Sequence, residues 1–322
     1  MRPLRSRFIR TLAVVPALAV LAACGGASGG ASGGGSGSPT PSGQGAFPVT
    51  VKAANGSVRI GHRPTRIVSL SPTATEMLYA IHAGTQVKAV DSLSDYPANA
   101  PRTKLSSLHP NVEAIAKYRP DLVVISNDVG GLAKSLGKLS VPVLLQPAAT
   151  GLGDTYDQLR QLGTATGHSA DATREVTSMQ TSIRKIVASA PKLKRPLTFY
   201  HELDQTRYSV TSKTFIGKLY GMLGLHDIAD KAKGAGGGYP QLSAEYIVKA
   251  DPDVVFLADT KCCGQSQATV AKRPGWSDIA AVRHHAVFAL DDDVASRWGP
   301  RVVVFLRTVE HDVATLQANG GG

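Results

Sequence analysis

The fold is decided by Asn111-Val-Glu-Ala-Ile-Ala-Lys-Tyr-Arg-Pro-Asp-Leu-Val-Val-Ile125, a stretch that returns 132 residues later as Ser243-Ala-Glu-Tyr-Ile-Val-Lys-Ala-Asp-Pro-Asp-Val-Val-Phe-Leu257. In both copies a capping residue opens a helix, Glu and Ile follow at the same places, and Pro-Asp leads into an apolar run. The shared register indicates two lobes built on one helix-strand plan. Convergence is the alternative, because Pro-Asp before a strand is a common combination.

Strands and helices alternate along the chain on both sides of these copies. The expected strands are 66–70, 87–90, 122–125, 141–145, 197–201, 254–257 and 286–290. Because parallel strands need helical crossovers, this order predicts an α/β fold with parallel sheets covered on both faces. Thr73 and Glu76 have the spacing of a capping box, which predicts the start of the first helix.

One predicted helix is much longer than the others and runs from about residue 170 to 189. Val176, Met179, Ile183 and Val187 fall on one of its faces. At 1.5 Å per residue it spans roughly 30 Å, about the width of a small domain. Pro191 ends it.

The N-terminus has the layout of an export signal. An apolar run from Leu12 to Ala23 follows an arginine-rich start and is too short to span a bilayer as a mature helix. The run ends in Leu-Ala-Ala-Cys24, which resembles the lipobox of bacterial lipoproteins. We therefore expect residues 1–23 to be a lipoprotein signal peptide and Cys24 to be the lipidation site. An ordinary secretory signal with a chance cysteine is the alternative.

Residues 24–46 are nearly all Gly, Ser, Ala and Pro. Such a segment cannot bury a core, so we expect a flexible tether between a lipid anchor and the folded part. Acyl chains, and not a transmembrane helix, would then attach the protein to the membrane.

The composition argues against two classes of function. The formal net charge of +11 is spread along the chain, and without a helix-turn-helix or interleaved aromatic and basic residues it predicts no nucleic-acid partner. The part after the tether contains no Gly-x-Ser-x-Gly elbow, no His-Glu-x-x-His and no Gly-x-x-x-x-Gly-Lys loop. An enzyme is therefore disfavoured.

Several motifs together resemble those of the class III periplasmic-type binding proteins, which serve ABC importers of cobalamin, ferric siderophores and haem. They are Arg66-Ile-Val-Ser-Leu-Ser-Pro-Thr-Ala-Thr-Glu76, Ser94-Asp-Tyr-Pro97, Asn111-Val-Glu113, Pro120-Asp-Leu-Val123, Arg273-Pro-Gly-Trp276 and Trp298-Gly-Pro-Arg301. No single motif is decisive, but their order and spacing are fairly specific, and they cover about residues 58–318.

The resemblance implies a domain plan and a set of partners. It implies an N-terminal α/β lobe at 47–167, a single connecting helix at 168–190 and a C-terminal α/β lobe at 191–322, with a ligand cleft between the lobes. A helical connection implies modest movement on binding. The expected partners are a small-molecule ligand, an ABC permease dimer and the membrane, and the expected state is a monomer without a cofactor or metal of its own.

Most candidate ligand contacts follow from the rule that ligands of open parallel sheets sit beyond the carboxyl ends of the strands. They are Ser71, Pro72, Thr73, Tyr96, Asn127, His201, Tyr208, Arg297 and Trp298. The resemblance adds His109, because it implies that the loop before the Asn111 helix lines the cleft. Ser71 to Thr73 open a helix whose free amides can face an anion, although plain capping explains them equally well.

Two of these sites have a more specific chemistry. Tyr96 can stack on a macrocycle or ligate haem iron, or it can be a packed turn residue. Arg297 beside Trp298 suits a carboxylated or aromatic ligand, with structural stacking as the alternative.

Glu113 and Glu245 occupy matching places in the internal repeat. The resemblance implies that such a pair, one on each lobe, docks on arginines of the permease dimer. A carboxylate in the first turn of a helix is also favoured by the helix dipole. The dipole explains each glutamate singly but not their pairing across the lobes.

Cys262 and Cys263 are adjacent. In an oxidising compartment they can form a vicinal disulfide, in a tight ring because neighbouring Cα atoms are closer than a disulfide prefers. Two free thiols or soft-metal ligands are the alternative. Since they follow a second-lobe strand, a disulfide here is expected to present a stiff apolar ridge to the cleft, so that mild reduction weakens ligand binding.

These observations predict a lipid-anchored substrate-binding component of an ABC importer, on the outer face of the cytoplasmic membrane at the cell surface or in the periplasm. The ligand is expected to be a corrinoid or a ferric siderophore. Ser94-Asp-Tyr-Pro97 favours the corrinoid, whereas the positive charge and Arg273-Pro-Gly-Trp276 favour the siderophore. A haem-binding surface protein or relay is the alternative, and an extracellular hydrolase is third.

Overall fold

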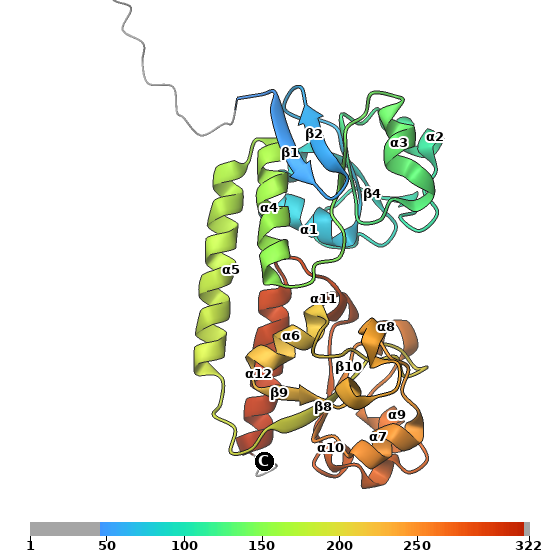
Figure 1. Ribbon diagram of the computed structural model, residues 1–322, viewed down its shortest axis with the longest axis vertical. Helices are drawn as coiled ribbons and strands as arrows, with labels where there is room; N and C mark the ends of the chain where they lie inside the picture. Colours follow the sequence, from blue (N-terminus) through green and yellow to red (C-terminus); the bar gives the residue numbers. More distant parts are fainter. Residues whose placement is uncertain (1–45, 319–322) are drawn as a thin grey trace, which may run out of the picture. The chain divides into compact units, whose positions relative to one another are not determined.

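The computed structural model describes residues 46–318 and contains two parallel β-sheets flanked by helices (Figure 1). The predicted signal peptide, Cys24 and the predicted tether up to residue 45 lie outside the described residues. Within 46–318 no helix combines the length and the apolar character needed to cross a bilayer. The predicted α/β fold with two parallel-sheet lobes is confirmed.

The first sheet has five parallel strands in the order β5-β4-β3-β6-β7. Their bounds are β3 Ile67–Leu70, β4 Val87–Asp91, β5 Arg102–Leu105, β6 Leu122–Ile125 and β7 Val143–Leu145. Every residue of β3 and β6 is buried, as expected for strands covered on both faces. An antiparallel hairpin of β1 (Val49–Ala53) and β2 (Gly56–Ile60) precedes this sheet in the chain.

The second sheet has four parallel strands in the order β11-β10-β8-β9. Their bounds are β8 Leu197–Glu202, β9 Leu225–Asp227, β10 Val254–Leu257 and β11 Val287–Ala289. An aromatic cluster forms its core, in which the ring of Tyr220 contacts Phe199, Phe256 and Phe305 at centroid distances of 4.2, 5.0 and 5.2 Å. Such ring pairs add to the hydrophobic effect of burial.

Most helices are short. Those near the first sheet are α1 Pro72–Ala80, α2 Val112–Ala116 and α3 Leu132–Gly137. Those that follow β8 are α6 Phe215–Met222, α7 Ala244–Ala250, α8 Thr260–Cys263, α9 Gln267–Ala271, α10 Ala280–Arg283, α11 Asp292–Ser296 and α12 Val302–Ala318. Single 3₁₀ turns are η1 Gly84–Gln86, η2 Val129–Gly131, η3 Ile228–Lys231, η4 Ala235–Gly237 and η5 Trp276–Asp278.

Two long helices, α4 (Leu152–Thr166) and α5 (Ser169–Ser189), connect β7 to β8 along the chain (Figure 1). They pack closely, because a Cβ added at Gly163 would lie 2.5 Å from the Cβ of Ala172. The buried face of α5 includes Val176, Met179 and Ile183, as the 3.6-residue period predicts, but Ile186 is more deeply buried than the expected Val187.

Both copies of the repeat adopt the same local structure. Asn111 and Ser243 cap α2 and α7, each accepting from the amide three residues later. Asp121 accepts from backbone amides just before β3, and Asp253 accepts from an amide of β8. The Pro-Asp signal therefore marks a carboxylate that ties the start of one strand to the start of its neighbour.

The predicted capping box at the first helix is wrong. Ser71 is the N-cap, because its side chain accepts from the amide of Ala74, and Pro72 takes the first helical position. Thr73 lies inside the helix, and Glu76 points into the protein with a side chain only 1% exposed. A glutamate near the start of a helix can therefore bind a distant partner instead of capping its own helix end.

Candidate functional site

A cavity of about 360 Å³ lies at the carboxyl edge of the first sheet. Loops after β3, β4 and β6 form one side, and α11 with the turn after it forms the other. The lining residues are Ser71, Pro72, Thr73, Ser92, Leu93, Asp95, Arg102, Ser126, Asp293, Ser296, Arg297 and Trp298. Small-molecule sites have volumes of about 300–1,000 Å³, so this cavity is a candidate ligand site.

Buried hydroxyl groups hold the loops beneath the cavity. The hydroxyl of Thr75 donates to Oγ of Ser69 (2.9 Å) and lies 3.0 Å from Oγ of Ser94, which donates to Oδ1 of Asp91 (2.6 Å). All four residues are buried. Buried polar groups are costly unless they are hydrogen-bonded. This series of hydrogen bonds therefore holds the loops after β3 and β4 together. Ser94 therefore belongs to the scaffold and not to the cavity wall.

Arg297 is held in place by acceptors on three elements. Its Nη1 donates to Oε1 of Glu76 on α1 (2.8 Å). Its Nη2 donates to the carbonyl of Leu93 (3.0 Å), to Asp95 (2.9 Å) and to Asp293 on α11 (2.6 Å). The side chain is only 8% exposed. The protein itself therefore satisfies this guanidinium, which clamps α1, the loop after β4 and α11 together.

Glu76 completes the clamp with a second arginine. Arg301 donates from Nε to Oε2 of Glu76 (2.9 Å) and from Nη2 to Oε1 (2.6 Å). Its guanidinium also lies 4.3 Å from the ring centroid of Tyr96. Burial lowers the pKa of Arg301, but the hydrogen bond and charge of Glu76 outweigh it and raise the pKa overall. Likewise burial raises the pKa of Asp95, yet Arg297 lowers it overall.

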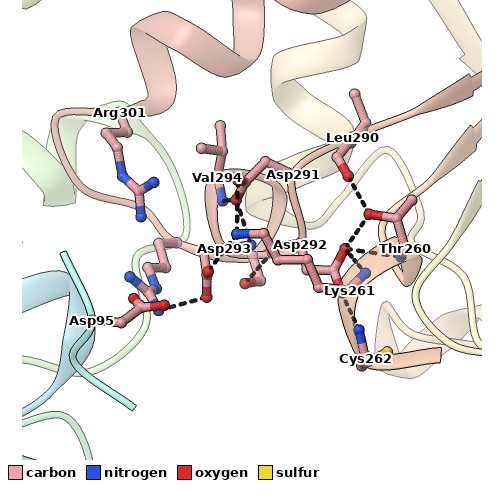
Figure 2. A network of polar contacts seen from close by, with 12 residues as sticks. Asp95, Thr260, Lys261, Cys262, Leu290, Asp291, Asp292, Asp293, Val294 and Arg301 are labelled. Carbon is pink, nitrogen blue, oxygen red and sulfur yellow. Dashed lines mark hydrogen bonds and ion pairs between the residues drawn. The ribbon is translucent and has the colours of Figure 1, made fainter. Parts of the chain in front are cut away.

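Three consecutive aspartates, Asp291 to Asp293, order the loop beside the cavity, and Figure 2 shows their contacts. Asp292 accepts from the amides of the first three residues of α8 and so caps that helix. Lys261 Nζ lies 2.8 Å from Asp291 and 3.0 Å from Asp293. Burial raises the pKa of Asp292, but the α8 amides outweigh it and lower the pKa overall.

Cys262 and Cys263 form a disulfide at the end of α8. Neither cysteine is among the residues that line the 360 Å³ cavity. The expected apolar ridge is therefore not part of the wall of this cavity.

Half of the predicted ligand contacts line the cavity together, namely Ser71, Pro72, Thr73, Arg297 and Trp298. The indole of Trp298 donates from Nε1 to Oε1 of Gln158 (2.9 Å), and its carbonyl accepts from the hydroxyl of Thr155 (2.9 Å). Both partners belong to α4, so this helix fixes the orientation of the ring at the cavity wall.

Four predicted contacts lie outside the cavity lining. Tyr96 is 46% exposed, but Arg301 covers a face of its ring. His109, Asn127 and Tyr208 are exposed, and none of them lines the cavity. Asn127 directly follows Ser126, which does line it.

The prediction for His201 is wrong. β8 extends to Glu202, one residue beyond its expected end, so His201 is an interior residue of the strand and not its last one. The side chain is fully buried, with Nδ1 2.8 Å from the hydroxyl of Tyr220. Burial lowers the pKa of His201 to about 3, so the imidazole is neutral and belongs to the core of the second lobe.

Arg273-Pro-Gly-Trp276 is also turned inward. Arg273 donates to both carboxylate oxygens of buried Glu202 (2.6 and 2.5 Å) and lies 4.5 Å from the ring centroid of buried Trp276. Because Arg273 stabilises the interior of the protein, the segment gives no support for a siderophore ligand. Burial and the neighbouring charge of Glu202 also raise the pKa of Asp259 to about 7.

Arg102 is a cavity residue that the sequence analysis missed. Arg102 does not follow a strand but opens β5. It pairs in register with Val90, near the end of β4, so the amino end of β5 reaches the edge where the neighbouring strand ends. Nothing in the sequence indicates this offset.

Glu113 and Glu245 are exposed and occupy the first turns of α2 and α7. Among residues 46–318 neither forms an ion pair. The backbone amide of Glu245 and the side chain of Ser243 lower the pKa of Glu245. Both carboxylates are therefore available to a partner.

Comparison with known proteins gives consistent matches. The family described as periplasmic binding protein matches residues 67–294. The chain is 30% identical to an uncharacterised ABC transporter substrate-binding lipoprotein, YvrC, of Bacillus subtilis over 80% of this chain and 82% of the relative. It is 29% identical to a cobalamin-binding protein of Halobacterium salinarum over 93% and 82% of the two chains.

A solved structure shows the same fold. It belongs to a possible iron-binding (periplasmic solute-binding) protein from Staphylococcus epidermidis. The TM-score is 0.68 at 26% identity, and the match covers 78% of this chain and 99% of the other.

Proposed function

Because the chain belongs to the periplasmic binding protein family, whose members bind solutes for transport and are not enzymes, we propose that it is the lipid-anchored substrate-binding component of an ABC importer. It captures its solute outside the cytoplasm and delivers it to a permease dimer. The observation that carries this proposal is the 360 Å³ cavity, which loops of the first lobe and the α11 segment line together.

The ligand that we propose is a corrinoid or a ferric chelate. The similarity to the cobalamin-binding protein of H. salinarum supports the corrinoid, and the fold shared with the possible iron-binding protein of S. epidermidis supports the chelate. The cavity offers one large aromatic ring, Trp298, and several hydroxyl groups, which suit a bulky ligand with a polar rim. Ser71, Pro72, Thr73 and Arg297 are the other predicted contacts in its wall.

Membrane attachment in this proposal depends on Cys24. The lipobox-like Leu-Ala-Ala-Cys24 supports it, as does the similarity to a relative described as a lipoprotein. Acyl chains on this residue would keep the protein close to the permease.

Permease docking is assigned to Glu113 and Glu245. Each is exposed at the start of a short helix, and the two helices are the two copies of the internal repeat. A pair of equivalent carboxylates fits a partner that presents two equivalent cationic sites, as a permease dimer does.

A binding panel combined with uptake tests the proposal. Purified full-length protein is titrated with cyanocobalamin, ferric siderophores and haemin, and cells carrying Glu113→Lys/Glu245→Lys are assayed for uptake of the ligand that binds. We expect one ligand to bind with micromolar or tighter affinity, and the double variant to bind it normally but to lose uptake. A Soret band in the purified protein would favour the haem-binding alternative.

The matched control is Asp157→Lys/Asp278→Lys, which reverses one exposed carboxylate before α5 and one after it. Uptake should survive in this control. If the control loses uptake to the same extent, or if the glutamate variant imports normally, the docking assignment is wrong. If no member of the panel binds, the solute class is wrong.

A further inference from the structure

The charged residues of the cavity wall differ in how they are satisfied. Four charged side chains line the cavity: Asp95, Arg102, Asp293 and Arg297. Arg297 binds both aspartates and Glu76, and Lys261 also binds Asp293. These charges neutralise one another within the protein.

Arg102 is the exception. Within residues 46–318 its guanidinium forms no ion pair and no hydrogen bond, and its residue is exposed. The remaining polar groups of the wall are the hydroxyls of Ser71, Thr73, Ser92, Ser126 and Ser296, which carry no charge. The wall therefore presents a guanidinium that the protein leaves for another partner.

We infer that this cavity selects ligands that carry an oxyanion, such as a carboxylate or an anionic iron-chelating group, at the edge that faces Arg102. The inference rests on the proposed solute-binding function and names the substrate class of the same site. A guanidinium binds a carboxylate through two parallel hydrogen bonds, a geometry that a neutral amide cannot reproduce.

The position of Arg102 supports this role. It is the first residue of β5 and is level with Val90 of β4, so the backbone of the sheet holds its Cα at the cavity edge. The start of α1, which is formed by Ser71 to Thr73, lies in the same wall and adds the positive end of a helix dipole. Both features favour negative charge on the bound solute.

Matched ligand pairs test the inference, because each pair differs mainly in charge. The pairs are cyanocobalamin and its monocarboxylic acid, haemin dimethyl ester and haemin, and the N-acetyl and N-succinyl derivatives of ferrioxamine B, of which the second member carries the oxyanion. In the pair that binds, we expect the oxyanion to bind about 10- to 100-fold more tightly, as expected for a charge-assisted hydrogen bond. Higher salt should reduce this preference, because the site is open to solvent.

The variant Arg102→Gln should reduce the preference to less than about threefold, because the oxyanion member loses its charge-assisted hydrogen bonds. Arg102→Lys should keep part of it, since the charge remains but the fork geometry is lost. Lys104→Gln removes an exposed cation from the same strand without touching the cavity wall and should keep the full preference. Unchanged thermal unfolding in all three variants verifies the fold.

Two results overturn the inference and separate it from the proposed function. If a pair binds but its two members bind equally, or if Arg102→Gln keeps the preference, the oxyanion assignment is wrong while solute binding stands. If no probe binds the wild-type protein, the proposed solute classes fail and the inference fails with them.

Discussion

The carboxyl edges of the two sheets use polar groups in opposite ways. At the first sheet the edge opens into the cavity, and the groups beneath it are hydroxyls that end on Asp91. At the second sheet Glu202 and Asp259 are buried, and Arg273 binds Glu202. The helix, cap and strand of the repeat recur in both lobes, but the polar groups at the strand ends have different roles in the two lobes.

The two sheet edges therefore have different roles in the proposed function: the first binds the ligand, and the second supports the fold. The first edge offers neutral hydroxyls and Arg102 to a ligand, whereas at the second edge Arg273 binds Glu202 inside the protein. The α11 segment links the two regions, because Arg297 binds Glu76 of α1 and Asp292 caps α8. A ligand at the first edge therefore contacts a wall whose position is fixed from the second lobe.

The largest expected effect comes from breaking the link itself. Glu76→Gln would leave Arg297 and Arg301 without the carboxylate that binds both. Because the side chains of Glu76 and Arg297 are 1% and 8% exposed, we expect a loss of about 3–5 kcal/mol in the free energy of unfolding, measured by urea denaturation.

The control is Asp157→Asn, which breaks the exposed ion pair with Arg160 and should cost less than about 0.5 kcal/mol. Equal losses in the two variants would show that the clamp adds no more stability than a surface pair.

A smaller effect, which depends on pH, is expected at the second edge. The folded-state pKa of Asp259 is raised to about 7, above its ordinary value of 3.8. Its stabilising contribution is therefore complete below pH 3.8 and is lost as the pH rises through 7. Asp259→Asn should remove this loss and stabilise the protein at pH 8 by on the order of 1–2 kcal/mol, with a smaller gain at pH 5.

Urea unfolding at pH 5 and pH 8 checks this prediction. Asp278→Asn changes an exposed carboxylate and should show the same pH dependence as the wild-type protein. If Asp259→Asn gains no more stability at pH 8 than at pH 5, the pKa of Asp259 is not raised in the folded protein.

The smallest effects are expected around α8. Asp292→Ala removes the carboxylate that caps this helix and should cost about 1 kcal/mol, as expected for an N-cap. Cys262→Ser/Cys263→Ser should cost less, because a disulfide between neighbours restricts little of the unfolded chain.

The loss of ligand affinity should also be smaller for Cys262→Ser/Cys263→Ser than for Asp292→Ala, since neither cysteine lines the cavity. Titration of the two variants with the preferred ligand measures this. A larger loss of affinity in the cysteine variant than in Asp292→Ala would place the disulfide at the ligand after all.

The sequence predicted the parts of the fold that have strong local signals. β6 and β10 are fully apolar runs after Pro-Asp and were predicted with their observed bounds. β5 (Arg-Thr-Lys-Leu) and β9 (Leu-His-Asp) were missed because short strands with polar residues look like loops. The error at His201 came from a strand end displaced by one residue, which is the least reliable part of such a prediction.

The site was predictable only where it follows strand ends. Ser71 to Thr73, Arg297 and Trp298 were found by that rule. The partner of Arg297 was not, because Glu76 lies 221 residues away and looked like a helix cap. Arg102 was missed because the register of β5 against β4 is a tertiary property.

The central claim is that the solute binds in the cavity between the first-sheet loops and α11. Ser296→Trp fills this cavity from α11, whereas Ser277→Trp adds the same ring at an exposed site away from it. Isothermal titration of both variants with the ligand that the wild-type protein binds tests the claim most directly. We predict a loss of affinity of about 100-fold or more for Ser296→Trp and wild-type affinity for Ser277→Trp. Wild-type affinity in both variants would show that the solute binds elsewhere.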